Sequence, residues 1–120
     1  NFYSLTKLLG EYESRRTKSC VVRCLFKPTP FKHDFACVDQ FTSGDEVGRI
    51  AEEVAIAIRN FDRLPETIHI GTERKSTFEL AIRSKPDIKP CKIEDIKTVK
   101  LPRDTSLNCS KWEAIKNGIN

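Results

Sequence analysis

The chain has 120 residues, of which 38% are hydrophobic and 32% are charged, and its formal net charge at pH 7 is +4. This length suits one domain with a single core, and the composition excludes a mostly disordered chain. The longest apolar runs are far shorter than the ~20 residues needed to span a bilayer, so we expect no membrane contact. The charge is compatible with nucleic-acid binding without demanding it.

The five cysteines form an odd set without a C-x-x-C pair: Cys20, Cys24, Cys37, Cys91 and Cys109. At least three lie in apolar runs typical of strands, so we interpret them as free thiols of a cytoplasmic or nuclear protein. A structural zinc site would need four convergent ligands, which these spacings do not supply. The missing initiator Met predicts an excised or processed fragment.

The first 40 residues predict one helix and two strands. Leucines at helical spacing from Leu5 to Tyr12 predict a short helix, and the polar residues 13–18 predict a basic loop after it. The β-branched run from Cys20 to Phe26 predicts a buried strand that ends before two prolines. Residues 34–39 predict a second short strand with an acid at each end.

The most regular pattern predicts the main helix at residues 45–61. Ser43 to Glu46 has the form S-x-x-E of a capping box. The apolar residues that follow have helical spacing: Val47, Ile50, Val54, Ala57, Ile58 and Phe61. Next, alternating apolar residues predict a β-hairpin over 67–83. With a strand or an extended segment in 93–101 and a terminal helix near Trp112, residues 1–120 are predicted to form a single α+β domain with a mixed or antiparallel sheet.

Three carboxylates are candidate catalytic residues and metal ligands. Asp34 and Asp39 flank the predicted second strand, and Glu73 lies at the tip of the predicted hairpin. Carboxylates bind Mg²⁺ or Mn²⁺, and such an ion can activate water and stabilise charge that develops on phosphorus. The structural alternative is three solvated acids. A regular strand would also place Asp34 and Asp39 on opposite faces, so a shared site needs a bulge or a strand end.

Basic residues near these acids are candidate RNA contacts, because Lys and Arg neutralise backbone phosphates. They are Arg15, Arg16 and Lys18 in the predicted basic loop, and Arg74 and Lys75 beside Glu73.

The stretch 34–83 resembles the Schlafen core, the AlbA-like fold of Schlafen-type RNA nucleases. The segment 34–41 matches the family's strand pattern E-S-x-x-V-E-F-K in spacing. Residues 53–61 correspond to the family helix that reads like "ISAFANT". Residues 67–75 correspond to the strand that reads like "GYIFIGVDD", and residues 77–82 to the return strand. On this alignment the three candidate carboxylates fall on the family's acidic positions.

This resemblance implies a metal-dependent RNA endonuclease that cuts structured or precursor RNA. Schlafen nucleases use two cores side by side, so the resemblance also implies a subunit that pairs with a second core, as a homodimer or with a related chain. Two alternatives stay open. One is a single-stranded nucleic-acid-binding OB-fold, in which Tyr3, Phe26 and Phe31 would stack on bases. The other is a Schlafen-like scaffold that has lost catalysis.

Overall fold

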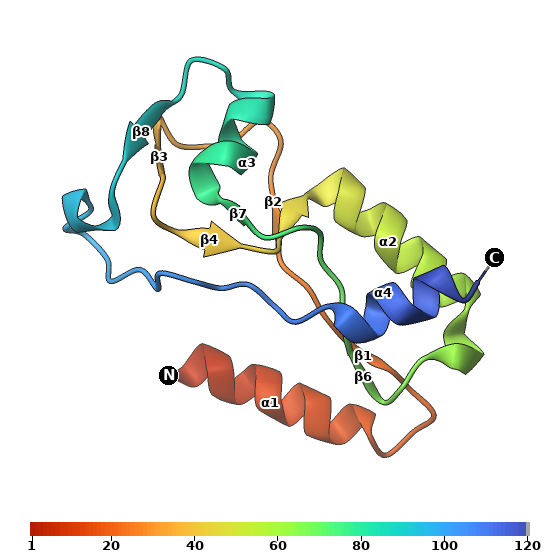
Figure 1. The fold of residues 1–120 in the computed structure, drawn as a ribbon. Helices are drawn as coiled ribbons and strands as arrows, with labels where there is room; N and C mark the ends of the chain where they lie inside the picture. The colour runs from red at the N-terminus through yellow and green to blue at the C-terminus, as the bar shows by residue number, and fades with distance from the viewer. Residues whose placement is uncertain (120) are drawn as a thin grey trace.

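A computed structural model describes residues 1–119, which form a small α+β domain (Figure 1). Within these residues, four α-helices and two short 3₁₀ helices are present. They are α1 (Phe2–Ser14), α2 (Val47–Arg59), η1 (Phe61–Arg63), α3 (Thr77–Ser84), η2 (Ile93–Asp95) and α4 (Ser110–Asn117). No helix in this part of the chain is long and apolar enough to cross a membrane.

The strands are short and pair two by two instead of forming one sheet. Three pairs are parallel and one is antiparallel. The parallel pairs are β1 (Val21–Arg23) with β6 (Thr67–His69), β2 (Phe26–Lys27) with β5 (Asp45–Glu46), and β3 (Phe35–Cys37) with β8 (Lys89–Cys91). The antiparallel pair is β4 (Phe41–Thr42) with β7 (Lys75–Ser76). The described residues therefore contain no closed barrel of the OB-fold kind.

Two hydrophobic clusters form the core. The first joins α2, β6 and α4 through Ala57, Ile68 and Trp112, and the second joins β3 and α3 through Ala36 and Ala81. Trp112 is fully buried, and its indole Nε1 donates a hydrogen bond of 2.6 Å to Glu53 on α2. A large aromatic side chain with a satisfied N–H thus anchors the C-terminal helix to the body of the domain.

The helices predicted near the N-terminus, at 45–61 and near Trp112 are confirmed, but the predicted capping box at Ser43 is wrong. Asp45 and Glu46 pair with β2 as a strand, so α2 begins at Val47 without a side-chain cap. The Ser43 hydroxyl instead accepts a hydrogen bond from the amide of Leu107. Ser43 and Glu46, which would cap the helix in isolation, make tertiary contacts instead.

The predicted hairpin over 67–83 is also wrong, because Thr77–Ser84 forms α3 and β6 pairs with β1. A capping box starts α3: the Ser76 hydroxyl accepts from the amide of Glu79, and the Glu79 carboxylate accepts from the amide of Ser76. Within 93–101, where a strand or an extended segment was expected, residues 93–95 form η2 and residues 96–101 belong to no helix or strand; the neighbouring strand is β8, at 89–91.

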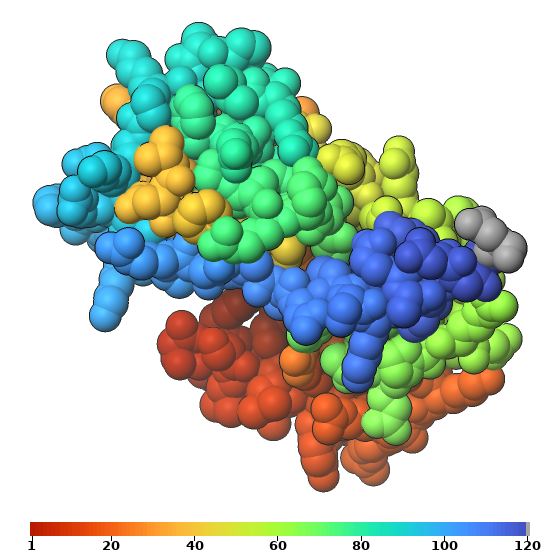
Figure 2. Space-filling model, in the orientation of Figure 1, coloured from red at the N-terminus to blue at the C-terminus, as the bar shows by residue number. Residues whose placement is uncertain are grey.

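Helix α1 stands at the edge of the molecule (Figure 1; red in Figure 2). Glu11 holds it to β1 by accepting two hydrogen bonds, of 2.8 and 2.7 Å, from Arg23. The radius of gyration, 16.1 Å, exceeds the roughly 14 Å expected for a compact chain of this length. Five residues of α1, each more than half exposed, form what we call the apolar stripe: Phe2, Leu5, Leu8, Leu9 and Tyr12.

Candidate functional site

A buried carboxylate lies at the centre of the candidate site. Asp45, the first residue of β5, is 0% exposed. Its Oδ1 accepts a hydrogen bond of 2.8 Å from the amide of Glu46. Its Oδ2 accepts from the Thr72 hydroxyl at 2.7 Å and from Arg49 Nη1 at 3.0 Å. A charged group without access to water needs such partners, so these contacts keep Asp45 ionised inside the fold.

Lys75 on β7 is the buried countercharge, with 4% exposure. Its Nζ lies 3.4 Å from Asp45 Oδ2 and donates hydrogen bonds to the Thr72 hydroxyl and to the carbonyls of Gly44 and Glu73. The Thr72 hydroxyl therefore accepts a hydrogen bond from Lys75 and donates one to Asp45. This network ties β5 to the loop before β7, and so joins the start of α2 to the start of α3.

Half-exposed charged residues cover the buried pair. Arg49 is 51% exposed at its side chain, Arg83 39% and Glu73 56%. Arg83 Nη2 donates to Glu73 at 2.9 Å, and Arg83 Nη1 lies 3.6 Å from Asp45 Oδ2. We call six residues the charged cluster: Asp45, Arg49, Thr72, Glu73, Lys75 and Arg83. It holds three cations and two carboxylates, which leaves a formal charge of +1.

Both carboxylates of the charged cluster stay ionised at neutral pH. Burial alone raises the pKa of Asp45, but its hydrogen bonds from Thr72 and Glu46 and the nearby Lys75 and Arg49 lower that pKa below the ordinary value. The hydrogen bond between Arg83 and Glu73 lowers the pKa of the carboxyl and raises that of the guanidinium.

The three predicted metal ligands lie in separate sets of contacts. Asp34 is 85% exposed and pairs with Lys85 Nζ at 2.7 Å. Asp39 accepts a hydrogen bond of 2.9 Å from the amide of Ile93, and Glu73 belongs to the charged cluster. Within residues 1–119, no group of three or more His, Cys, Asp or Glu side chains is arranged to hold a metal ion. The described residues therefore offer single carboxylates instead of a complete ligand set.

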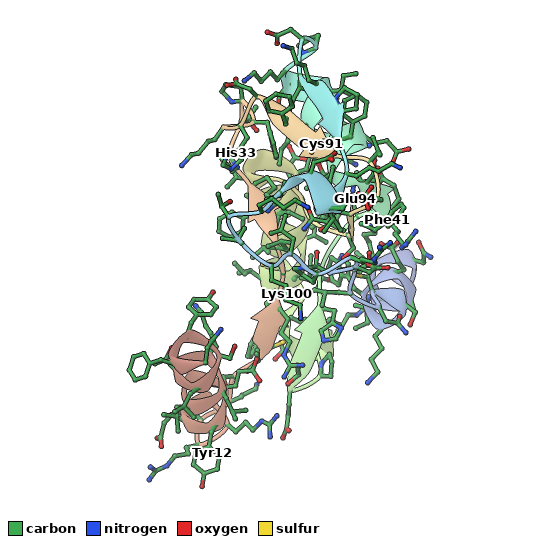
Figure 3. All side chains as sticks on the ribbon, turned by 90° about the vertical axis from the view of Figure 1, so that its left-hand side faces the viewer. Tyr12, His33, Phe41, Cys91, Glu94 and Lys100 are labelled. Atoms are coloured by element: carbon green, nitrogen blue, oxygen red, sulfur yellow. The ribbon has the colours of Figure 1, made fainter. Side chains whose placement is uncertain are left out.

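The predicted RNA contacts also have different surroundings. Arg15, Arg16 and Lys18 are exposed after α1, and Arg16 and Lys18 form surface ion pairs with neighbouring carboxylates. The Arg74 guanidinium lies 3.8 Å from the centre of the Phe41 ring, which Figure 3 labels. Lys75, in contrast, is buried and fully engaged in the charged cluster, so its ammonium is not presented to solvent.

Sequence reasoning missed Asp45, Arg49, Thr72 and Arg83 as members of one site. Asp45 and Arg49 lie within the predicted helix at 45–61, and their separation of four residues is a signal for an ion pair. Nothing in the local pattern brings residues 72–83 next to them. That proximity arises from the pairing of β2 with β5 and of β4 with β7.

Comparisons of this chain with models of protein families, with curated proteins and with solved structures found no match. The fold and the charged cluster thus define a small α+β domain with a buried ion pair beneath half-exposed arginine and glutamate side chains.

Proposed function

We propose that this chain is an RNA-binding core of a Schlafen-like RNA-processing nuclease, acting as a subunit. One observation carries the proposal: the buried Asp45 carboxylate contacts both Arg49 and Arg83, so two half-exposed guanidinium groups are held close together at the surface. Two such groups in a cluster of net positive charge suit the phosphates of an RNA backbone.

The chemistry of arginine supports this proposal. A guanidinium has five N–H donors in a fixed fork, and the contacts within the charged cluster use a minority of them. The remaining donors are available to phosphate oxygens. Because Asp45 and Lys75 are buried, they position the two arginines without having to contact RNA themselves.

We expect the double variant Arg49→Gln/Arg83→Gln to bind RNA about tenfold more weakly than the wild type. Each lost phosphate contact should also lower the slope of log affinity against log salt by about one, so the slope should fall by about two. Fluorescence anisotropy with a labelled RNA hairpin and a labelled single strand, at several salt concentrations, measures both quantities.

Two controls sharpen this test. Arg49→Lys/Arg83→Lys keeps the charge and should retain most of the salt slope. Arg59→Gln/Lys111→Gln removes two exposed cations elsewhere on the surface and should change binding little. If that second control weakens binding as much as the loss of Arg49 and Arg83, net charge is responsible and the proposed site is rejected.

RNA cleavage with Mg²⁺ or Mn²⁺ is the second part of the proposal. Asp34, Asp39 and Glu73 are the carboxylates that would serve it, each as a single ligand, so a complete metal site would need carboxylates from a second core. That requirement agrees with a subunit that works in a pair, as the resemblance to the Schlafen core implies.

Asp39→Asn should reduce metal-dependent RNA cleavage by about 100-fold or more, because it removes a charged ligand. The asparagine keeps an oxygen that can accept from the Ile93 amide, so the fold should be preserved. Cleavage of structured RNA, followed on denaturing gels with Mg²⁺ or Mn²⁺ and any co-purifying partner, measures the change. Cleavage that survives the substitution removes Asp39 from the site, and RNA binding without any cleavage favours an inactive scaffold.

A second copy of this chain is the partner that we propose for the apolar stripe. Complete burial of its five side chains would remove roughly 600 Å² per copy from water. A symmetric pair would then bury roughly 1,200 Å², the lower end of the range for specific interfaces. In a homodimer with a twofold axis, the apolar stripe of one copy would pack against the apolar stripe of the other. Twofold symmetry is the commonest arrangement in homodimers.

A further inference from the structure

Two cysteine sulfurs from distant parts of the sequence lie in contact. Cys37 ends β3 and Cys91 ends β8, and the parallel register pairs them directly. Their Sγ atoms are 3.5 Å apart. Neighbouring strands lie about 4.8 Å apart, within the Cα separation of about 4.4 to 6.8 Å that a disulfide accepts. The backbone is therefore already placed for a bond between these sulfurs.

The two thiols differ in their access to solvent. Cys37 is 2% exposed, whereas Cys91 is partly exposed and borders a shallow surface hollow beside Val38 and Asp95. Figure 3 shows Cys91 far from Tyr12 of α1, at the other end of the molecule. A small oxidant from solvent would therefore reach Cys91 first.

The two sulfurs share one hydrogen bond, in which either thiol can be the donor. The other cysteines have different neighbours: Cys109 donates to the carbonyl of Leu107.

We propose that Cys37 and Cys91 are a redox-sensitive pair, which a hydroperoxide converts into a reversible intramolecular disulfide. The Cys91 sulfur attacks the peroxide, the O–O bond breaks to leave a sulfenic acid on Cys91, and the leaving hydroxide takes the Cys91 proton to become the first water. The Cys37 sulfur then attacks the Cys91 sulfur, the S–S bond forms, and the leaving hydroxide takes the Cys37 proton to become water. The two thiols together supply two electrons, which reduce one hydrogen peroxide to two waters.

The bond would enclose residues 37–91, a segment that contains the whole charged cluster. A crosslink that closes a long loop stabilises a protein mainly by restricting the unfolded chain. Oxidation would therefore raise the free energy of unfolding of the segment that carries the charged cluster. This inference does not depend on the proposed RNA function.

The test treats the purified 120-residue chain with hydrogen peroxide, quenches it with catalase and blocks the remaining thiols with N-ethylmaleimide. The reduced, denatured chain should take up five maleimides and the oxidised chain three, with peptide mapping that joins Cys37 to Cys91. Dithiothreitol should restore all five. The oxidised chain should also melt at a temperature higher by about 10 °C.

Single variants test the roles of the two sulfurs. Cys91→Ser, at a partly exposed position, should fold normally and form no intramolecular disulfide, and Cys37→Ala should accumulate a sulfenic acid on Cys91 that dimedone captures. Cys20→Ser should oxidise like the wild type. The proposal is overturned if other cysteines form the bond, if the link joins two molecules, or if Cys91→Ser loses thiols as fast as the wild type.

Discussion

Asp45→Asn should lower the free energy of unfolding by about 3 to 5 kcal/mol, because it removes the buried countercharge of Lys75 and leaves that ammonium only the half-exposed Glu73 carboxylate, at 3.8 Å. The contacts to Thr72 and Arg49 would weaken at the same time, since both are made to a charged oxygen. Urea unfolding followed by circular dichroism measures the change. We expect a loss that is large beside the usual stability of a small domain.

Two further variants distinguish the stability that the buried Asp45–Lys75 pair contributes from the stability that the exposed charged residues contribute. Glu73→Gln removes a carboxylate that is 56% exposed, so we expect a cost below about 1 kcal/mol. Asp45→Asn/Lys75→Met removes both buried charges and should recover part of the stability that Asp45→Asn loses. An Asp45→Asn variant as stable as Glu73→Gln would show that the buried pair does not hold the site together.

The same variant should alter the dependence of stability on pH. A carboxyl whose pKa is lower in the folded state, as that of Asp45 is, contributes stability that is present above its unfolded pKa of about 3.9. This contribution is lost as the pH falls through the folded value. The difference in stability between the wild type and Asp45→Asn should therefore shrink below about pH 4.

Leu8→Asp/Leu9→Asp should raise the dissociation constant of the proposed dimer by at least about 100-fold. Each substitution would place a charge where the apolar stripes of two copies meet, and burying an unpaired charge is costly. Analytical ultracentrifugation across a concentration series measures the dissociation constant. Thr6→Asp, on the same helix but outside the stripe, is the matched control and should change it little.

A wild-type chain that stays monomeric at all concentrations would reject the second copy as the partner of the apolar stripe. RNA binding at the charged cluster could still be observed in that case, because Arg49 and Arg83 belong to one copy. Dimerisation that is unaffected by Leu8→Asp/Leu9→Asp would instead place the interface on another surface.

The sequence by itself determined the α+β class and three of the four α-helices in residues 1–119, namely α1, α2 and α4. Val47 to Arg59 has apolar residues at helical spacing, and its helix needs only local hydrogen bonds and one buried face. The N-terminal and C-terminal helices were predicted for the same reason. Helical periodicity is a property of neighbouring residues, so it can be seen before any tertiary contact is known.

Only the tertiary structure decided how the strands pair and where the charged cluster lies. Thr77–Ser84 has alternating apolar residues, yet the Ser76 cap and the burial of Leu80 and Ala81 make it a helix. Asp45, Lys75 and Arg83 come together because short strands pair between segments about 19 to 35 residues apart. Strand pairing joins groups that are remote in sequence, so the local pattern could nominate Glu73 and Lys75 but not Asp45, the buried carboxylate that pairs with Lys75.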